Sequence, residues 1–288
     1  MYAVTAITGQ VGSVVARTLL ADNQAVRAVV RNREKGSEWQ ARGCELALAD
    51  MDDSVALQQT FSGAEAVFIL LPPTFDPSPG YPEARRTIAS IRAALEAARP
   101  QRVVCLSTIG ADATQPNLLN QLGLLEEALR TLPMPVAFLR AGWFMENSVW
   151  DVASARDFGV ISSFLQPLDK LVPMVATADV GRVAAEMMRE SWDGVHVVNL
   201  EGPKRITPNE IADTFGRLLG KPVRMQAIPI DMWKPLFTSQ GMKNPTPRIQ
   251  MINGFNEGWI EFDGGEQTSR KGSTTLETVL GQLIEKSL

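Results

Sequence analysis

The chain of 288 residues has few of the side chains that build metal sites and disulfides. It contains two cysteines, Cys44 and Cys105, and a single histidine, His196. Two distant cysteines and one histidine cannot supply the four ligands of a zinc site, so we expect no bound metal. Cys105 lies in an apolar run, and we expect both thiols to be buried and free. The apolar surroundings of His196 in the sequence favour a structural role for it over a catalytic one.

Long apolar runs and clusters of basic residues are also absent from the sequence. No run approaches the roughly 20 apolar residues of a membrane-spanning helix, so we expect no membrane contact. The net charge is −4 and the isoelectric point about 5.3, which disfavours a nucleic acid as a partner. An apolar run that starts at residue 2 and contains the first strand leaves no room for a signal peptide, and we expect a cytoplasmic protein.

What the sequence does contain is a regular alternation of short apolar segments and amphipathic segments. Strands are predicted over 4–7, 25–30, 44–48, 66–71, 102–106, 136–139 and 195–200. Helices are predicted from about residue 11 to 19, over 34–42, from 53 or 54 to 61, over 83–98 and over about 118–132. Repeated strand–helix units of this kind indicate a parallel sheet with helices on both faces.

A glycine turn directly after the first strand indicates a phosphate-binding site. The turn residues are Thr8, Gly9, Gln10 and Val11. The order of strand, glycine turn and helix is typical of dinucleotide-binding folds, in which the helix N-terminus binds the pyrophosphate. Ala6 stands where the usual pattern of three glycines begins. If residue 6 needs a positive φ, its methyl costs about 1–2 kcal/mol. If it has ordinary strand-end angles, the methyl only narrows the room for phosphate.

The second predicted strand ends in a basic segment rather than in a carboxylate. Arg31 follows the strand directly, and Lys35 lies close by in the sequence. A carboxylate at this point would hold the ribose 2′-hydroxyl of NAD, whereas a cation suits the 2′-phosphate of NADP. One charge-assisted hydrogen bond of about 1.5–3 kcal/mol gives a tenfold preference or more, so we predict NADPH as the cofactor. A solvated basic turn is the alternative. Asp50 ends the third strand and either faces the adenine or starts the next helix.

The C-terminal third is interrupted by prolines and contains several aromatic residues. Together with the glycine turn, the alternation predicts an α/β fold: a Rossmann-type doubly wound parallel sheet with a smaller C-terminal α/β lobe. We assign residues 1–142 plus about 176–201 to an NADP(H)-binding domain. Residues of about 143–175 plus 202–288 form the predicted substrate-binding lobe over the carboxyl edge of the sheet.

Eight segments resemble the NmrA-like branch of the atypical short-chain dehydrogenase/reductase superfamily. They are VTAITGQVG (4–12), VRN (30–32) with Lys35, FILLPP (68–73), LSTIGA (106–111), LRAGWFMEN (139–147), VATADVG (175–181), FNEG (255–258) and RKGSTTL (270–276). These segments span nearly the whole chain in order. The resemblance implies a Rossmann domain, a small C-terminal lobe and a cleft between them. Members of this family include NADPH-dependent quinone and dye reductases and non-catalytic sensors of the NADP/NADPH ratio.

Two features depart from the family pattern. The first turn glycine is Ala6, and the superfamily's catalytic Tyr-x-x-x-Lys pair is absent. Leu118 and Leu122 occupy the positions that we assign to this pair, and neither Tyr2 nor Tyr81 begins such a motif. Without an acid to protonate a carbonyl oxygen, reduction of a ketone is disfavoured. Quinones and cationic dyes accept a hydride to give a delocalised product that solvent can protonate.

Further residues are expected around the cofactor and the acceptor, although no catalytic residue can be assigned. Leu71 and Pro72 are expected beside the adenine and ribose, and Ser107, Gly142 and Phe144 beside the nicotinamide. The predicted acceptor-binding residues are Phe75, Trp143, Asn147 and Phe255. The proline-rich loop over 72–82 is either a lid over the cofactor or a rigid connection.

The sequence therefore predicts an NADPH-dependent oxidoreductase that passes a hydride to a quinone-like or aromatic small molecule. A non-catalytic NADP(H)-sensing regulatory protein is the first alternative, and a domain that has lost its cofactor through Ala6 is the second. A homodimer and a regulatory protein partner both stay open.

Overall fold

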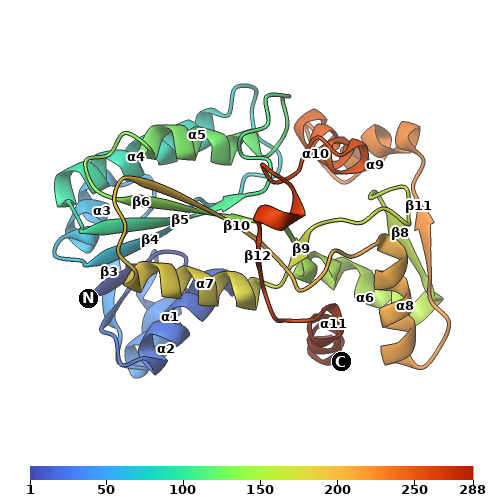
Figure 1. The fold of residues 1–288 in the computed structure, drawn as a ribbon, viewed down its shortest axis with the longest axis horizontal. Helices are drawn as coiled ribbons and strands as arrows, with labels where there is room; N and C mark the ends of the chain where they lie inside the picture. The colour runs from blue at the N-terminus through green and yellow to red at the C-terminus, as the bar shows by residue number, and fades with distance from the viewer. Residues whose placement is uncertain (288) are drawn as a thin grey trace.

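A computed structural model describes residues 1–287 of the chain. Its centre is a sheet of eight strands in the order β12-β10-β6-β5-β4-β1-β2-β3, and each neighbouring pair is parallel. In Figure 1, helices α3, α4 and α5 lie on one face of this sheet, and helices α1, α2 and α7 on the other. The predicted Rossmann-type α/β fold is confirmed.

Strands and helices alternate along the chain from β1 to β6. The sheet strands are β1 (Tyr2–Val4), β2 (Val26–Val30), β3 (Glu45–Leu48), β4 (Ala66–Leu70), β5 (Arg102–Thr108), β6 (Val136–Ala141), β10 (Val195–Glu201) and β12 (Arg270–Lys271). The helices around the sheet are α1 (Gln10–Ala21), α2 (Arg33–Ala41), α3 (Ser54–Phe61), α4 (Pro82–Ala98), α5 (Asn120–Leu129) and α7 (Thr177–Arg189).

The remaining elements form a smaller unit beyond the carboxyl ends of the strands (Figure 1). They are β7 (Trp143–Phe144), η1 (Met145–Asp151), α6 (Val152–Phe158), β8 (Val160–Ser163), β9 (Met174–Val175), α8 (Pro208–Leu219), β11 (Arg224–Ala227), η2 (Ile230–Met232), α9 (Trp233–Ser239), α10 (Thr246–Glu257), η3 (Glu266–Thr268) and α11 (Leu276–Lys286). Strand β7 pairs with β9, and β8 pairs with β11, in two small sheets.

Most predicted strands and helices are present with ends shifted by a few residues. The predicted first strand is wrong, and helix α7 and the elements of the lobe are absent from the prediction. The first strand is predicted over 4–7, whereas β1 ends at Val4 and a turn begins at Thr5. The reason is that Ala6 adopts a positive φ of 50°, which no extended strand contains. Strand β12, which pairs with β10, is absent from the prediction because two residues carry no periodicity. The division into two domains stays a prediction, and within it residues 270–271 join the main sheet rather than the lobe.

Apolar residues fill both faces of the sheet. Along β4, Ala66 and Phe68 face the core under α1 and α7, while Val67 and Ile69 face the core under α3 and α4. A strand buried on both faces needs apolar residues at every position, which explains the continuous apolar run. The lobe has a third core that includes the fully buried Trp233. Both cysteines are free and buried, as predicted.

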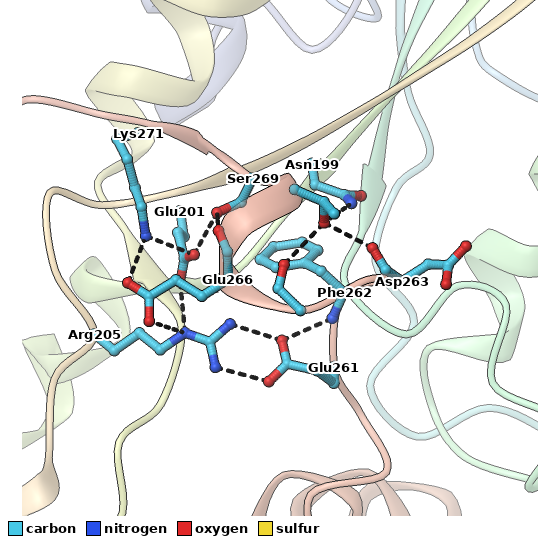
Figure 2. A network of polar contacts seen from close by, with 11 residues as sticks. Asn199, Glu201, Arg205, Glu261, Phe262, Asp263, Glu266, Ser269 and Lys271 are labelled. Atoms are coloured by element: carbon cyan, nitrogen blue, oxygen red, sulfur yellow. Dashed lines mark hydrogen bonds and ion pairs between the residues drawn. The ribbon is translucent and has the colours of Figure 1, made fainter.

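A polar network fastens the end of β10 to the segment that precedes and includes β12 (Figure 2). Glu201 is fully buried and accepts hydrogen bonds from Arg205 at 3.0 Å and Lys271 at 2.8 Å. Ser269 donates a further hydrogen bond to Glu201, and Arg205 also forms a bidentate pair with Glu261 at 2.7 and 2.8 Å. Because two cations surround the buried carboxylate, its charge is compensated. The network therefore fixes residues 261–271, which we call the C-terminal strap, against the sheet.

Within residues 1–287, no helix combines the length and the apolar character that crossing a membrane requires. The same residues contain no group of three His, Cys, Asp or Glu side chains suited to hold a metal ion.

Candidate functional site

The turn between β1 and α1 places Ala6 in the left-handed region of backbone conformation. Its φ is 50°, and its carbonyl oxygen accepts a hydrogen bond from the N–H of Gly9 at 2.9 Å. A Cβ on Gly12 would lie 2.3 Å from the same oxygen, so only glycine permits the helix to start this close to the turn. Of the two alternatives for Ala6, the structure shows the one with a positive φ. The turn thus places an alanine in a conformation that favours glycine.

The start of α1 lies open beyond this turn. Gly9 is the N-cap residue, and none of the side chains in residues 1–287 caps the helix. Thr8, Gly9 and Gln10 are exposed, whereas Val11 is buried in the core. Uncapped N–H groups at a helix start, together with the positive end of the helix dipole, form a site for an anion.

Thr5 connects this turn to the end of β4. Its hydroxyl donates to the carbonyl oxygen of Phe68 at 2.9 Å and accepts from the N–H of Leu70 at 3.1 Å. Leu71, which follows β4, is buried, and Pro72 is exposed. Leu71 and Pro72, the two predicted adenine-side residues, therefore follow a strand end that is bonded to the glycine turn. Sequence reasoning misses Thr5, because it predicts that the strand continues through this residue.

The basic segment after β2 is free of partners. Arg31 and Lys35 are exposed, and neither side chain has a hydrogen bond or an ion pair within residues 1–287. Asn32 starts α2 by accepting a hydrogen bond from the N–H of Glu34 at 2.7 Å. The local fold thus leaves both cations available to an anionic ligand.

Asp50 is exposed after β3, and its carboxylate accepts from the N–H of Asp52 at 3.0 Å. The cap of α3 is Asp53, which accepts from the N–H groups of Val55 and Ala56. Helix capping is therefore the role of Asp53, and the adenine contact of Asp50 stays a prediction.

A buried ionic network lies where β5 and β6 end beneath α5. Glu126 is 3% exposed and accepts from the Ser107 hydroxyl at 2.6 Å and from Arg140 at 2.9 and 2.8 Å. Arg130 also donates to Glu126 at 2.6 Å, and Arg140 donates to Asp112 at 2.6 Å. Ser107 is itself 2% exposed, so the network occupies its hydroxyl, and its contact with a nicotinamide stays a prediction.

The charge state of Glu126 decides what it can do chemically. Burial raises its pKa, but hydrogen bonds from Arg140 and Ser107 outweigh this effect, and the net pKa lies below its ordinary value. Glu126 is therefore an ionised acceptor of hydrogen bonds and not a proton donor. Sequence reasoning does not find this network. The sequence signal that could have indicated it is a charged residue, Arg140, inside an apolar strand.

Two of the predicted acceptor-binding residues are brought together. The rings of Trp143 and Phe255 meet edge to face, with centroids 5.2 Å apart. Phe255 is buried in the lobe and Trp143 is partly buried against it. Phe144, by contrast, packs against the core of the main sheet. Trp143 and Phe144 thus join the two cores.

The other predicted residues differ in their surroundings. A Cβ on Gly142 would lie 2.6 Å from the carbonyl oxygen of Pro173, so only glycine fits at this position without a shift of the backbone. Asn147 is exposed in η1, and Phe75 is 63% exposed in the loop after β4. A hollow of about 360 Å³ between α4 and α5 is lined by Tyr81, Arg85 and Asp112, but by none of the predicted cofactor residues.

Comparison with known proteins decides the family. The model of the NmrA-like family matches residues 2–277. The chain belongs to the NmrA-like family. It is 26% identical over 244 residues to an NAD(P)H azoreductase of Xenophilus azovorans, covering 84% of this chain and 82% of that protein. It is 27% identical over 228 residues to quinone oxidoreductase 2 of Escherichia coli K12, covering 78% of this chain and 77% of that protein.

A solved structure shares the fold of this NmrA-like chain. The NADPH-dependent quinone oxidoreductase of Escherichia coli, complexed with NADPH, matches it with a TM-score of 0.82 and 24% identity. The match covers 98% of this chain and 99% of that one. The two chains therefore share their overall fold.

Ala6→Gly should stabilise this NmrA-like protein. The substitution removes the cost of a left-handed alanine, which is about 1–2 kcal/mol. It also raises the conformational entropy of the unfolded chain, which cancels about 0.4–1 kcal/mol of this gain. We expect a melting temperature higher by about 2–4 °C in thermal unfolding. Ala89→Gly, on the exposed face of α4, is the control and should lower the melting temperature. A decrease for Ala6→Gly as large as the control's would show that the methyl contributes to packing.

Glu126→Gln should destabilise the protein strongly, because it removes the buried carboxylate that pairs with Arg140 and leaves the half-exposed Asp112 as the carboxylate partner. Breaking a buried pair of this kind costs about 3 kcal/mol or more, which urea unfolding measures. The adjacent Glu127 is exposed, so Glu127→Gln should change the free energy of unfolding by less than about 0.5 kcal/mol. Equal effects of the two variants would contradict the role assigned to Glu126.

Proposed function

We propose that this chain is an NADPH-dependent oxidoreductase that passes a hydride to a quinone-like or aromatic acceptor. The observation that carries the proposal is the uncapped start of α1 behind the glycine turn, with Arg31 and Lys35 unpaired after β2. The relatives named as NAD(P)H azoreductase and quinone oxidoreductase support the same reaction class.

The residues present fit an NADP-type dinucleotide. Thr8, Gly9, Gln10 and Val11 would hold the pyrophosphate through backbone N–H groups, since no side chain in residues 1–287 caps the start of α1. Arg31 and Lys35 would hold the 2′-phosphate as cations. Asp50, Leu71 and Pro72 stay the proposed adenine-side contacts, and Ser107, Gly142 and Phe144 the proposed nicotinamide-side contacts.

The proposed acceptor class follows from the sequence, which has no Tyr-x-x-x-Lys pair to supply a proton. When bound, the nicotinamide supplies the hydride. Glu126 is ionised and engaged by Arg140, and it cannot protonate the product. An acceptor whose reduced form delocalises charge takes its proton from solvent and needs no such acid. The paired rings of Trp143 and Phe255, with Phe75 and Asn147, are the proposed acceptor contacts.

Arg31→Ala should weaken NADPH binding by about tenfold or more while NADH binding changes little, because one charge-assisted hydrogen bond to the 2′-phosphate is lost. Calorimetric titration with both nucleotides measures the two dissociation constants. Arg42→Ala, at the other end of α2, is the control and should alter neither. Equal losses for NADPH and NADH at Arg31 would mean that the 2′-phosphate lies elsewhere.

The wild-type chain should oxidise NADPH in the presence of at least one quinone, azo dye or triarylmethane dye, and should leave simple ketones unreduced. The loss of NADPH absorbance measures turnover across such a panel. Tight NADPH binding without turnover of any acceptor would contradict the enzyme proposal and favour the NADP(H)-sensing alternative.

A further inference from the structure

The proline-rich loop over 72–81 is fastened to the C-terminal lobe by one carboxylate. Asp76 accepts hydrogen bonds from the backbone N–H groups of Lys243 at 2.8 Å and Asn244 at 2.7 Å. The Asn244 side chain donates to the carbonyl oxygen of Pro77 at 2.8 Å. These three bonds, which we call the Asp76 clasp, join the loop after β4 to the turn between α9 and α10.

The same loop is also held on the side of α5. The side-chain amide of Gln121 donates to the carbonyl oxygen of Thr74 at 3.1 Å. At the end of the loop, the Tyr81 hydroxyl donates to the carbonyl oxygen of Asn117 at 2.9 Å. Tyr81 has a φ of 58°, a left-handed conformation that is rare for a residue with a large side chain. The loop is therefore fixed at both of its ends and bridges the main sheet and the lobe, as a rigid connection would.

The position of the loop relates it to the proposed site. It leaves the sheet at the carboxyl end of β4, which lies between β1 and β5. Ligands of open α/β sheets bind beyond the carboxyl ends of the strands. Thr5 ties the end of β4 to the glycine turn, so the loop begins beside the proposed cofactor site.

The ring of Phe75 stays exposed to solvent next to the Asp76 clasp. It directly precedes Asp76 and is 63% exposed, although its two neighbours in the sequence are only partly exposed. Four prolines restrict the loop, which lowers the entropy lost when this ring is held in place. The N–H groups of Lys243 and Asn244 lower the pKa of Asp76, so its carboxylate is charged at neutral pH. Hydrogen bonds to a charged acceptor are the stronger kind.

We infer that Asp76 is a positioning residue for the electron acceptor: its clasp on Lys243 and Asn244 fixes the ring of Phe75 as a wall of the acceptor site. The inference rests on the proposed function and adds the device that shapes the acceptor site. Asp76 itself touches neither cofactor nor acceptor in this account. A clasp that only tethered the lobe would affect stability but not the binding of the acceptor.

The test combines Asp76→Ala, Phe75→Ala and the double variant in the NADPH oxidation assay. Loss of one aromatic contact is worth about 0.5–1.5 kcal/mol, so each single variant should raise the KM for the acceptor about two- to tenfold. The dissociation constant of NADPH should stay within about twofold of the wild-type value. Because both substitutions remove the same wall, the double variant should be no worse than the poorer single variant. Asp213→Ala, an exposed carboxylate on α8, is the control.

Amide hydrogen exchange checks the clasp independently of activity. The N–H groups of Lys243 and Asn244 should exchange faster in Asp76→Ala than in the wild type and in Asp213→Ala. An active wild type whose acceptor KM is unchanged by Asp76→Ala would overturn the positioning role alone. Additive effects of the two single variants, or unchanged exchange at both amides, would also overturn it. If the wild type binds NADPH but reduces none of the acceptors in the panel, the proposed function and this inference are both overturned.

Discussion

The close contact between the glycine turn and the first helix is the constraint on which the proposed site depends. The carbonyl oxygen of Ala6 accepts the N–H of Gly9 and fills the space that a Cβ on Gly12 would need. This contact turns the chain sharply, so that α1 begins with N–H groups that no side chain in residues 1–287 caps. An alanine is tolerated in the left-handed region because the surrounding contacts fix the conformation. The cost of this alanine is therefore a loss of stability in the turn.

Polar contacts extend from this turn along the carboxyl edge of the sheet. Thr5 ties the turn to β4, and Glu126 ties the ends of β5 and β6 to α5. Glu201 does the same for β10 and the C-terminal strap (Figure 2). The cores on either face of the sheet are apolar, whereas its carboxyl edge is held in part by the buried carboxylates of Glu126 and Glu201 with compensated charge. Directional bonds at this edge fix the relative position of loops that apolar packing alone would leave adjustable.

Local patterns are sufficient to predict most strands of the main sheet and the helices from α1 to α5. The apolar run in β4 and the helical spacing in α1 and α4 depend on neighbours in the sequence, and these elements are present as predicted. The predicted end of β1 is wrong, because the positive φ of Ala6 is set by contacts with α1 rather than by strand propensity. The sequence alone also predicts the cations Arg31 and Lys35 after β2.

Contacts between distant segments could not be predicted. Asp76 meets residues that follow it by 167 and 168 positions, and Arg140 meets Glu126 across a strand and a helix. No periodicity encodes such pairs. The only hint is the charge itself, an arginine in the apolar strand β6 and an aspartate between prolines.

A crystal structure of the chain with NADPH tests the central claim most directly. The account predicts pyrophosphate oxygens within hydrogen-bond distance of the backbone N–H groups at the start of α1, and the 2′-phosphate against Arg31. A nucleotide bound elsewhere on the chain, or a turn that stays empty at saturating NADPH, would contradict it.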